Sequence, residues 1–118
     1  IEAESKAENS LMTIADNGGG IGFVFGDPVE DWQEVDFRQH LITLIVSGGA
    51  PADNFFGEMR CLPTEAAADL VNHLALRGHE MKVGDFISTG AASVPQPFSA
   101  GDHVRADFGA LGVIEVAF

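Results

Sequence analysis

The C-terminal stretch from Gly84 to Phe118 constrains the fold most, because short apolar runs alternate there with glycine-rich turns. Asp85 to Ser88 has the pattern of a strand, and a Ser-Thr-Gly turn follows it. Two further strands are expected near residues 102–108 and 113–118, joined by a tight turn that begins and ends with glycine. In the last strand, apolar side chains two residues apart face the same way. The stretch therefore predicts β-structure.

The preceding segments predict further strands. Residues 40–47 are β-branched and almost continuously apolar, which is typical of a strand buried on both faces. Phe55 and Phe56 then indicate a short partner strand, so that the two would form a hairpin. Another short apolar strand is expected at Phe23-Val24-Phe25, just after a glycine-rich run.

One helix is expected, over about residues 63–77. Pro63 suits a first helical turn, and Gly78 suits a C-terminal stop. Between them an apolar stripe recurs at helical spacing, formed by Ala67, Leu70, Val71 and Leu74. The sequence as a whole predicts a mostly β fold with one main helix.

Length and composition favour a single globular domain over residues 1–118. Because the chain opens at Ile1 rather than Met, we expect either processing or a piece of a longer protein. A net charge of −12 makes nucleic acid an unfavourable partner, and no apolar run is long enough to span a membrane. With no signal peptide visible and Cys61 as the lone cysteine, we expect a cytoplasmic protein without disulfides.

Three short patterns bear on chemistry. Ser88-Thr89-Gly90 ends a strand with hydroxyls and free backbone N–H groups, which suit a carboxylate, although a plain turn is the alternative. Glu2 and Glu4 would share one face of a strand and could hold a hard divalent cation. The glycine run at 18–22 lacks the lysine and spacing of a phosphate loop, so it is expected to be a turn beside a pocket.

Taken in order, these motifs resemble the C-terminal portion of the fumarylacetoacetate hydrolase superfamily, in its 2-keto-4-pentenoate hydratase and oxalocrotonate decarboxylase branch. The resemblance runs from about Ile14 to Phe118. It is carried by the following segments: Ala15-Asp16-Asn17, Gly22 to Gly26, Leu41 to Val46, Arg60-Cys61-Leu62-Pro63, Asn72 to Ala75, and the C-terminal stretch.

The resemblance implies a mixed β-roll, a homo-oligomer and a Mg²⁺- or Mn²⁺-dependent site for a small 2-keto acid. In such a hydratase-type lyase the metal, as Lewis acid, stabilises an enolate, and water then adds to the conjugated double bond of a 2-hydroxy-2,4-dienoate. Decarboxylation or C–C hydrolysis on the same scaffold is the alternative reaction. By resemblance, Thr89 with Gly90 falls at the substrate carboxylate and Ser88 precedes them, while Asp16 and Asn17 line the metal pocket.

The chain also departs from the family pattern. The family's metal ligands, a Glu-x-Glu pair and an Asp, lie upstream of the Ala-Asp-Asn segment, and only fourteen residues precede Ala15 here. Glu4 would replace the Asp, or Glu2 and Glu4 would mimic the pair, and at least one ligand is then missing. Gly19 and Gly20 also stand where many hydratases carry serine.

We therefore expect the C-terminal part of a longer catalytic domain, with exposed sheet edges that favour oligomerisation. The rival hypothesis is a non-catalytic family member that serves as a binding or assembly subunit.

Overall fold

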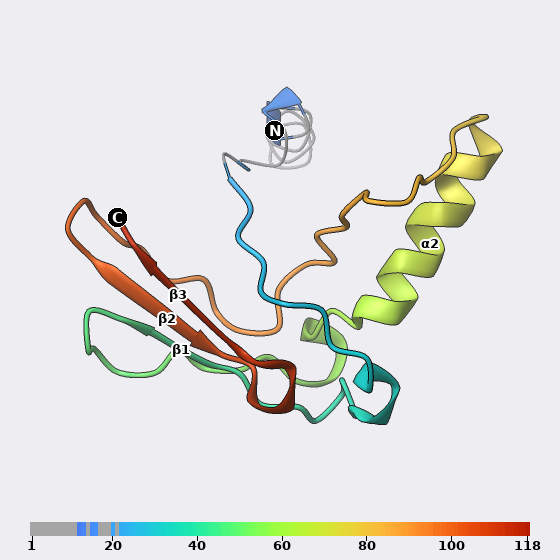
Figure 1. Cartoon of the computed structure of the whole chain (residues 1–118). Coiled ribbons are helices and arrows are strands. Elements are labelled where there is room, and N and C mark those ends of the chain that lie inside the picture. Colours follow the sequence, from blue (N-terminus) through green and yellow to red (C-terminus); the bar gives the residue numbers. More distant parts are fainter. Residues whose placement is uncertain (1–11, 14, 17–19, 21) are drawn as a thin grey trace, which may run out of the picture.

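The computed structural model describes residues 12–13, 15–16, 20 and 22–118. Its main features are a small β-sheet and one long helix, joined by extended loops (Figure 1). The elements, in chain order, are η2 (Trp32–Glu34), β1 (Thr43–Val46), η3 (Gly57–Met59), α2 (Pro63–Leu76), β2 (His103–Asp107), η4 (Gly109–Leu111) and β3 (Val113–Ala117). The expected mostly β fold with one main helix is confirmed.

The sheet is antiparallel with the strand order β1-β2-β3. Arg105, in the central strand, lies opposite Ile45 on one side and Glu115 on the other. On the outer side of β1 the Leu44 carbonyl accepts from the Ala52 N–H at 2.9 Å, whereas no strand lies beyond β3, and the sheet is not closed into a barrel in the part of the chain that the structure describes. Figure 1 shows the sheet on one side and α2 on the other, with the segment after α2 returning towards the sheet.

The turn between β2 and β3 forms as the two glycines predict. Gly109 and Gly112 have φ of +58° and +100°, a backbone conformation that residues other than glycine rarely adopt. The N–H of Phe108 donates to the Gly112 carbonyl at 2.8 Å, and the Asp107 carboxylate accepts from the Gly109 N–H at 2.9 Å. This N–H is the main cause, with Arg105 second, of an Asp107 pKa below its ordinary value. The two C-terminal strands are therefore confirmed with their turn.

Helix α2 begins and ends close to where the sequence predicts. Pro63 occupies the first turn, where its missing N–H costs nothing, and Gly78 follows the end with φ of +74°. The apolar stripe is covered only in part, because Leu74 is half-buried while Leu70 and Val71 remain exposed.

Three of the expected strands do not form. Residues 23–25 and 85–88 are extended but unpaired, and 55–56 make no hairpin with β1. An apolar run becomes a strand only where a neighbour offers backbone partners, and β1 takes its partner from β2. Phe25 instead stacks on Phe86, with ring centroids 4.4 Å apart.

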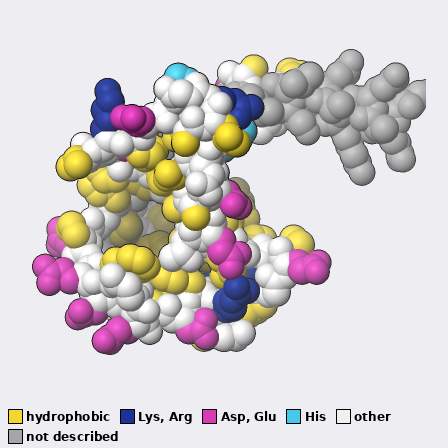
Figure 2. Space-filling view, turned by 90° about the vertical axis from the view of Figure 1, so that its right-hand side faces the viewer, with side chains coloured by type: hydrophobic (Ala, Val, Ile, Leu, Met, Phe, Trp, Pro, Cys, Tyr) yellow, Lys and Arg dark blue, Asp and Glu magenta, His cyan; other side chains and the backbone are white. Residues whose placement is uncertain are grey.

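Few side chains of the described part are buried. Only Ala52 and Arg60, each 7% exposed, fall in this class. The prediction that residues 40–47 are buried on both faces is wrong, since Leu44 and Ile45 are half-buried and Thr43 is exposed. Apolar side chains gather around a hollow on the face in Figure 2, with acidic side chains around its outer edge. Among the described residues, no helix has the length and apolar character needed to cross a membrane.

Asp102 fixes the segment that leads into β2. One of its carboxylate oxygens accepts from the Ser47 hydroxyl at 2.6 Å, and the other accepts from the Ser99 N–H at 2.7 Å. The Ser47 hydrogen bond, and after it the Ser99 N–H, lower the pKa of Asp102 from the ordinary 3.8. Ser47 itself has φ of +47°, so this contact also holds an uncommon backbone conformation at the end of β1.

We expect the stability contributed by Asp102 to depend on pH. Because its pKa is lower in the folded chain, the contribution is full above the unfolded pKa and is lost as pH falls through the folded pKa. Asp102→Asn should therefore be less stable than wild type at about pH 6, with the gap narrowing towards about pH 3. Urea unfolding at both pH values measures this, with Asp69→Asn on α2 as the control for loss of a carboxylate. A gap independent of pH would contradict the assignment.

Candidate functional site

Two segments far apart in sequence, residues 53–61 and 89–94, lie side by side. Asn54 and Ser93 form an isolated antiparallel bridge. Around it the Phe55 N–H donates to the Ala92 carbonyl at 2.9 Å, and the Val94 N–H donates to the Asp53 carbonyl at 2.8 Å. This pairing holds the Ser-Thr-Gly turn against the residues that precede α2.

Gly90 is required where the two segments approach most closely. Its φ is +108°, and a Cβ added there would lie 2.9 Å from the Cys61 sulfur. The Cys61 thiol donates to the Thr89 carbonyl, so the sulfur is directed at the turn. A side chain at position 90 would therefore separate Cys61 from the turn.

A cavity of about 460 Å³ opens between these segments and the sheet. Its walls come from residues around β1, from residues 60–63, from residues 89–95 and from the region of the β2–β3 turn. Most of the wall is apolar, and no Asp or Glu among the described residues lines it. The volume and character suit a small ligand with an apolar part.

Arg60 supplies the charge of this cavity. It is 7% exposed; its Nη1 donates to the Phe55 carbonyl at 3.2 Å and its Nη2 to the His40 carbonyl. Its carbon Cζ lies 5.9 Å from the centroid of the Phe56 ring. Its Nε is shielded from solvent and has no hydrogen-bond partner within the described part of the chain. The guanidinium is thus held by carbonyls rather than by a carboxylate.

The other described arginines differ in this respect. Arg38 pairs with Glu65 at 2.8 Å, and Arg105 pairs with Asp107 and Glu115 at 3.0 and 3.1 Å. Arg77 lies at the exposed end of α2. A buried cation without a carboxylate partner is costly, so Arg60 is the unusual member of the set.

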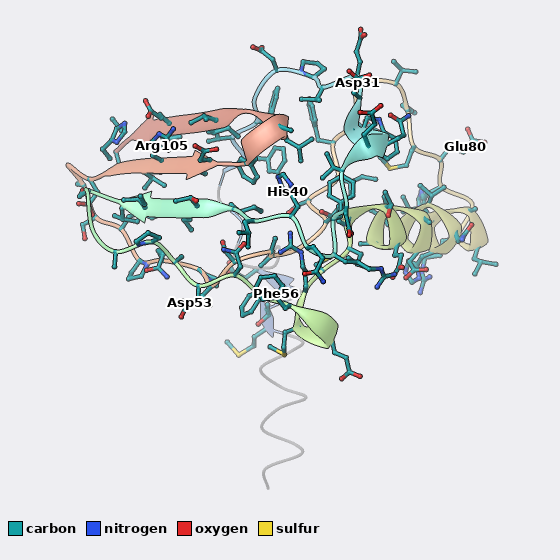
Figure 3. All side chains as sticks on the ribbon, turned by 90° about the horizontal axis from the view of Figure 1, so that it is seen from below. Asp31, His40, Asp53, Phe56, Glu80 and Arg105 are labelled. Atoms are coloured by element: carbon teal, nitrogen blue, oxygen red, sulfur yellow. The ribbon has the colours of Figure 1, made fainter. Side chains whose placement is uncertain are left out.

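His40 also lines the cavity, and it lies between the sheet and α2 in Figure 3. Its Nε2 is 2.6 Å from the Phe108 carbonyl oxygen. Because a carbonyl only accepts, Nε2 carries the hydrogen, and Nδ1 of the neutral ring is then the acceptor. Gly109 allows this contact, since a Cβ there would approach the ring carbon Cε1 to 3.3 Å.

Asn54 fixes the cavity wall at Ile42. Its side-chain oxygen accepts from the Ile42 N–H and its side-chain nitrogen donates to the Ile42 carbonyl, both at 2.8 Å. These two bonds act in place of a neighbouring strand just before β1 begins.

The structure brings together some of the residues expected from the sequence. Thr89 and Gly90 line the cavity, whereas Ser88 and Asp16 are exposed and lie outside its lining. Asn17, Glu2 and Glu4 lie outside the described residues. The described residues contain no group of three His, Cys, Asp or Glu side chains placed to hold a metal ion.

Sequence reasoning missed Arg60 and His40 as cavity residues. In the sequence, Arg60 stands out only as part of the Arg60-Cys61-Leu62-Pro63 segment. His40 has no second histidine at the spacing of a metal-binding pair. Their proximity depends on the pairing of distant segments, for which no local signal exists.

Comparison with curated proteins finds two relatives. A 4-oxalocrotonate decarboxylase of Pseudomonas putida is 24% identical over 108 residues, which cover 92% of this chain and 41% of that protein. The 4-oxalocrotonate decarboxylase of Pseudomonas sp. strain CF600 gives the same identity and coverage. The chain thus spans about two fifths of the length of these relatives. No protein-family model and no solved structure matches the chain. The similarity is consistent with a distant relationship to the fumarylacetoacetate hydrolase superfamily.

Proposed function

We propose that this chain forms part of a lyase that acts on a small 2-keto acid, with Thr89 and Gly90 receiving the substrate carboxylate. The observation that supports this most is the position of the turn, on the wall of an apolar cavity that contains a buried cation. The similarity to the two decarboxylases points to the same class of substrate.

Each part of the cavity has a role in this proposal. The Thr89 hydroxyl would donate to the carboxylate, and the absent side chain of Gly90 would let the turn lie against Cys61 at the cavity wall. Apolar walls would hold the carbon chain of the acid and exclude water from it. His40, fixed by the Phe108 carbonyl, would present Nδ1 as an acceptor.

Two lyase reactions are compatible with such a site. The hydratase reaction adds water to a dienoate and gives a 4-hydroxy-2-keto acid, while decarboxylation releases CO₂. The names of the two relatives favour decarboxylation, and the resemblance of the sequence motifs to hydratases favours hydration. Both need a held carboxylate, so the roles of the chain's own residues are the same. Identification of the product would separate them.

A divalent metal, Mg²⁺ or Mn²⁺, belongs to this proposal by resemblance, and when bound it would act as Lewis acid on the keto acid. The described cavity residues do not fit such an ion, because the buried cation Arg60 is among them and no Asp or Glu is. The ligands would therefore have to come from other residues, with Glu2 and Glu4 as the candidates on this chain. We derive no step through the metal.

A second candidate function is a binding or assembly subunit, and one feature favours it. Phe23, Phe25 and Phe86 are 54, 58 and 63% exposed, and their rings contact one another. Such an aromatic cluster, together with the edge strand β3, is typical of a surface that another chain covers. Assembly into a homo-oligomer is proposed on this ground, and it is compatible with either function.

The proposed function predicts that Thr89→Ala weakens binding of a 2-keto acid or of oxalate by about 1–3 kcal/mol, because a carboxylate contact is lost. Calorimetric titration in the presence of Mn²⁺ measures the affinity. Thr64→Ala is the matched control, since Thr64 is exposed on the first turn of α2 and lies outside the cavity.

An unchanged affinity in the Thr89 variant would remove this residue from the site. Absence of metal-dependent oxalate binding by the folded wild-type chain would mean that the metal ligands lie on another segment or have been lost, and in the second case the assembly subunit would be favoured.

A further inference from the structure

The positive charge of Arg60 in the cavity has no counter-charge among the described lining residues. A guanidinium has five N–H donors, and only two hydrogen bonds, to the Phe55 and His40 carbonyls, are formed by Arg60 within the described residues. Its Nε hydrogen has no partner there, although the side chain is almost fully buried. Removing a charge from water without a counter-charge costs several kcal/mol, so the site is electrostatically incomplete.

The described lining residues around Arg60 also provide no counter-charge. Most other residues of the cavity wall are apolar, and none of the described ones is Asp or Glu. An apolar wall lowers the local dielectric, which strengthens the attraction between the guanidinium and any anion that enters. This field acts across the cavity and does not require a contact with the shielded Nε.

We propose that Arg60 determines the specificity of this cavity for a small monoanionic carboxylate with a short apolar tail, and that it does so without a divalent metal. The proposal rests on the proposed function only in placing a small acid in this cavity. It differs in assigning the selection of charge to the protein itself, where the resemblance assigns it to a bound metal.

Binding in the presence of EDTA tests this assignment. The probes are 2-oxopentanoate and its neutral analogue 2-oxopentanamide, titrated into the whole chain by calorimetry. Wild type should bind the acid at least about tenfold more tightly than the amide, which corresponds to about 1.4 kcal/mol. Arg60→Gln should bind both alike, and Arg60→Lys should retain part of the preference because it keeps the charge.

Arg38→Gln provides the matched control. It also removes one arginine charge, but Arg38 is exposed, pairs with Glu65 and lies outside the cavity lining. Its preference for the acid should equal that of wild type. Equal affinity of wild type for acid and amide would overturn the proposal, and so would a preference that persists in Arg60→Gln.

A measurement on wild type covers the case in which Arg60→Gln fails to fold. The Nε–H resonance of Arg60, assigned by its loss in Arg60→Lys, should shift when the acid is added and stay in place with the amide. A resonance that does not respond to the acid would overturn the proposal.

The same experiments separate the two hypotheses. Selective binding in EDTA, with no turnover after Mn²⁺ is restored in excess, would support the role of Arg60 while the lyase proposal failed. Binding of oxalate only with Mn²⁺ would support the lyase and overturn the role of Arg60.

Discussion

Replacement of Gly90 by alanine is expected to destabilise the chain by about 2–4 kcal/mol. Two costs add: an alanine must adopt a backbone conformation with φ of +108°, and its Cβ would meet the Cys61 sulfur at 2.9 Å and the Cys61 Cβ at 3.1 Å. Because the clash lies between paired segments, relief requires the turn to move away from residues 60–63. The free energy of unfolding in urea measures the effect.

Gly84→Ala separates the two costs. Gly84 also has positive φ, at +96°, but an added Cβ there meets nothing within 4 Å. This variant should lose only about 1–2 kcal/mol, from the backbone alone. Cys61→Ala should partly rescue Gly90→Ala in a double-mutant cycle, since it removes the atom that the new methyl meets. Equal destabilisation of Gly84→Ala and Gly90→Ala, with no rescue, would contradict the close approach.

Asn54→Ala is expected to cost about 2–3 kcal/mol, because both backbone groups of Ile42 lose their partner at once. The position is half-buried, so water replaces these hydrogen bonds only in part. Since Ile42 immediately precedes β1 and lines the cavity, the variant should also weaken ligand binding. Urea unfolding and calorimetry on the same sample report the two effects.

Two further variants control this prediction. Asn72→Ala removes the same side chain from an exposed position of α2, and it should change stability by no more than about 0.5 kcal/mol. Asn54→Asp keeps an acceptor for the Ile42 N–H but places a negative oxygen against the Ile42 carbonyl, so it should be no more stable than the alanine variant. Wild-type stability in Asn54→Asp would show that the donor half of the amide is unimportant.

Local signals accounted for the elements that the sequence predicted well. Pro63 and Gly78 mark the ends of α2, and Gly109 and Gly112 mark the turn between the last two strands, because each meets a backbone requirement that few other residues meet. The failed strands, such as 23–25, satisfied the composition of a strand but lacked a neighbouring strand. Pairing is a property of distant segments, so a short apolar run does not reveal it.

The residues of the cavity also differ in whether a local sequence signal predicts them. Thr89 and Gly90 were found because they belong to a recognisable turn, and the structure places both at the cavity. Arg60 and His40 reach the cavity only because residues 53–61 pair with 89–94 and because His40 meets the end of β2. The position and isolation of the Arg60 charge emerge only once these contacts exist.

The scarcity of buried side chains bears on how this sequence can diverge. Packing inside the described part restricts few positions, chiefly Ala52 and Arg60, so most apolar positions would tolerate exchange if the chain acted alone. Under the proposed assembly, their apolar character would be maintained by selection through the chain that covers them. Substitutions at Phe25 or Phe86 would then be accepted only with matching substitutions in the covering chain, so that the two contacting surfaces would coevolve.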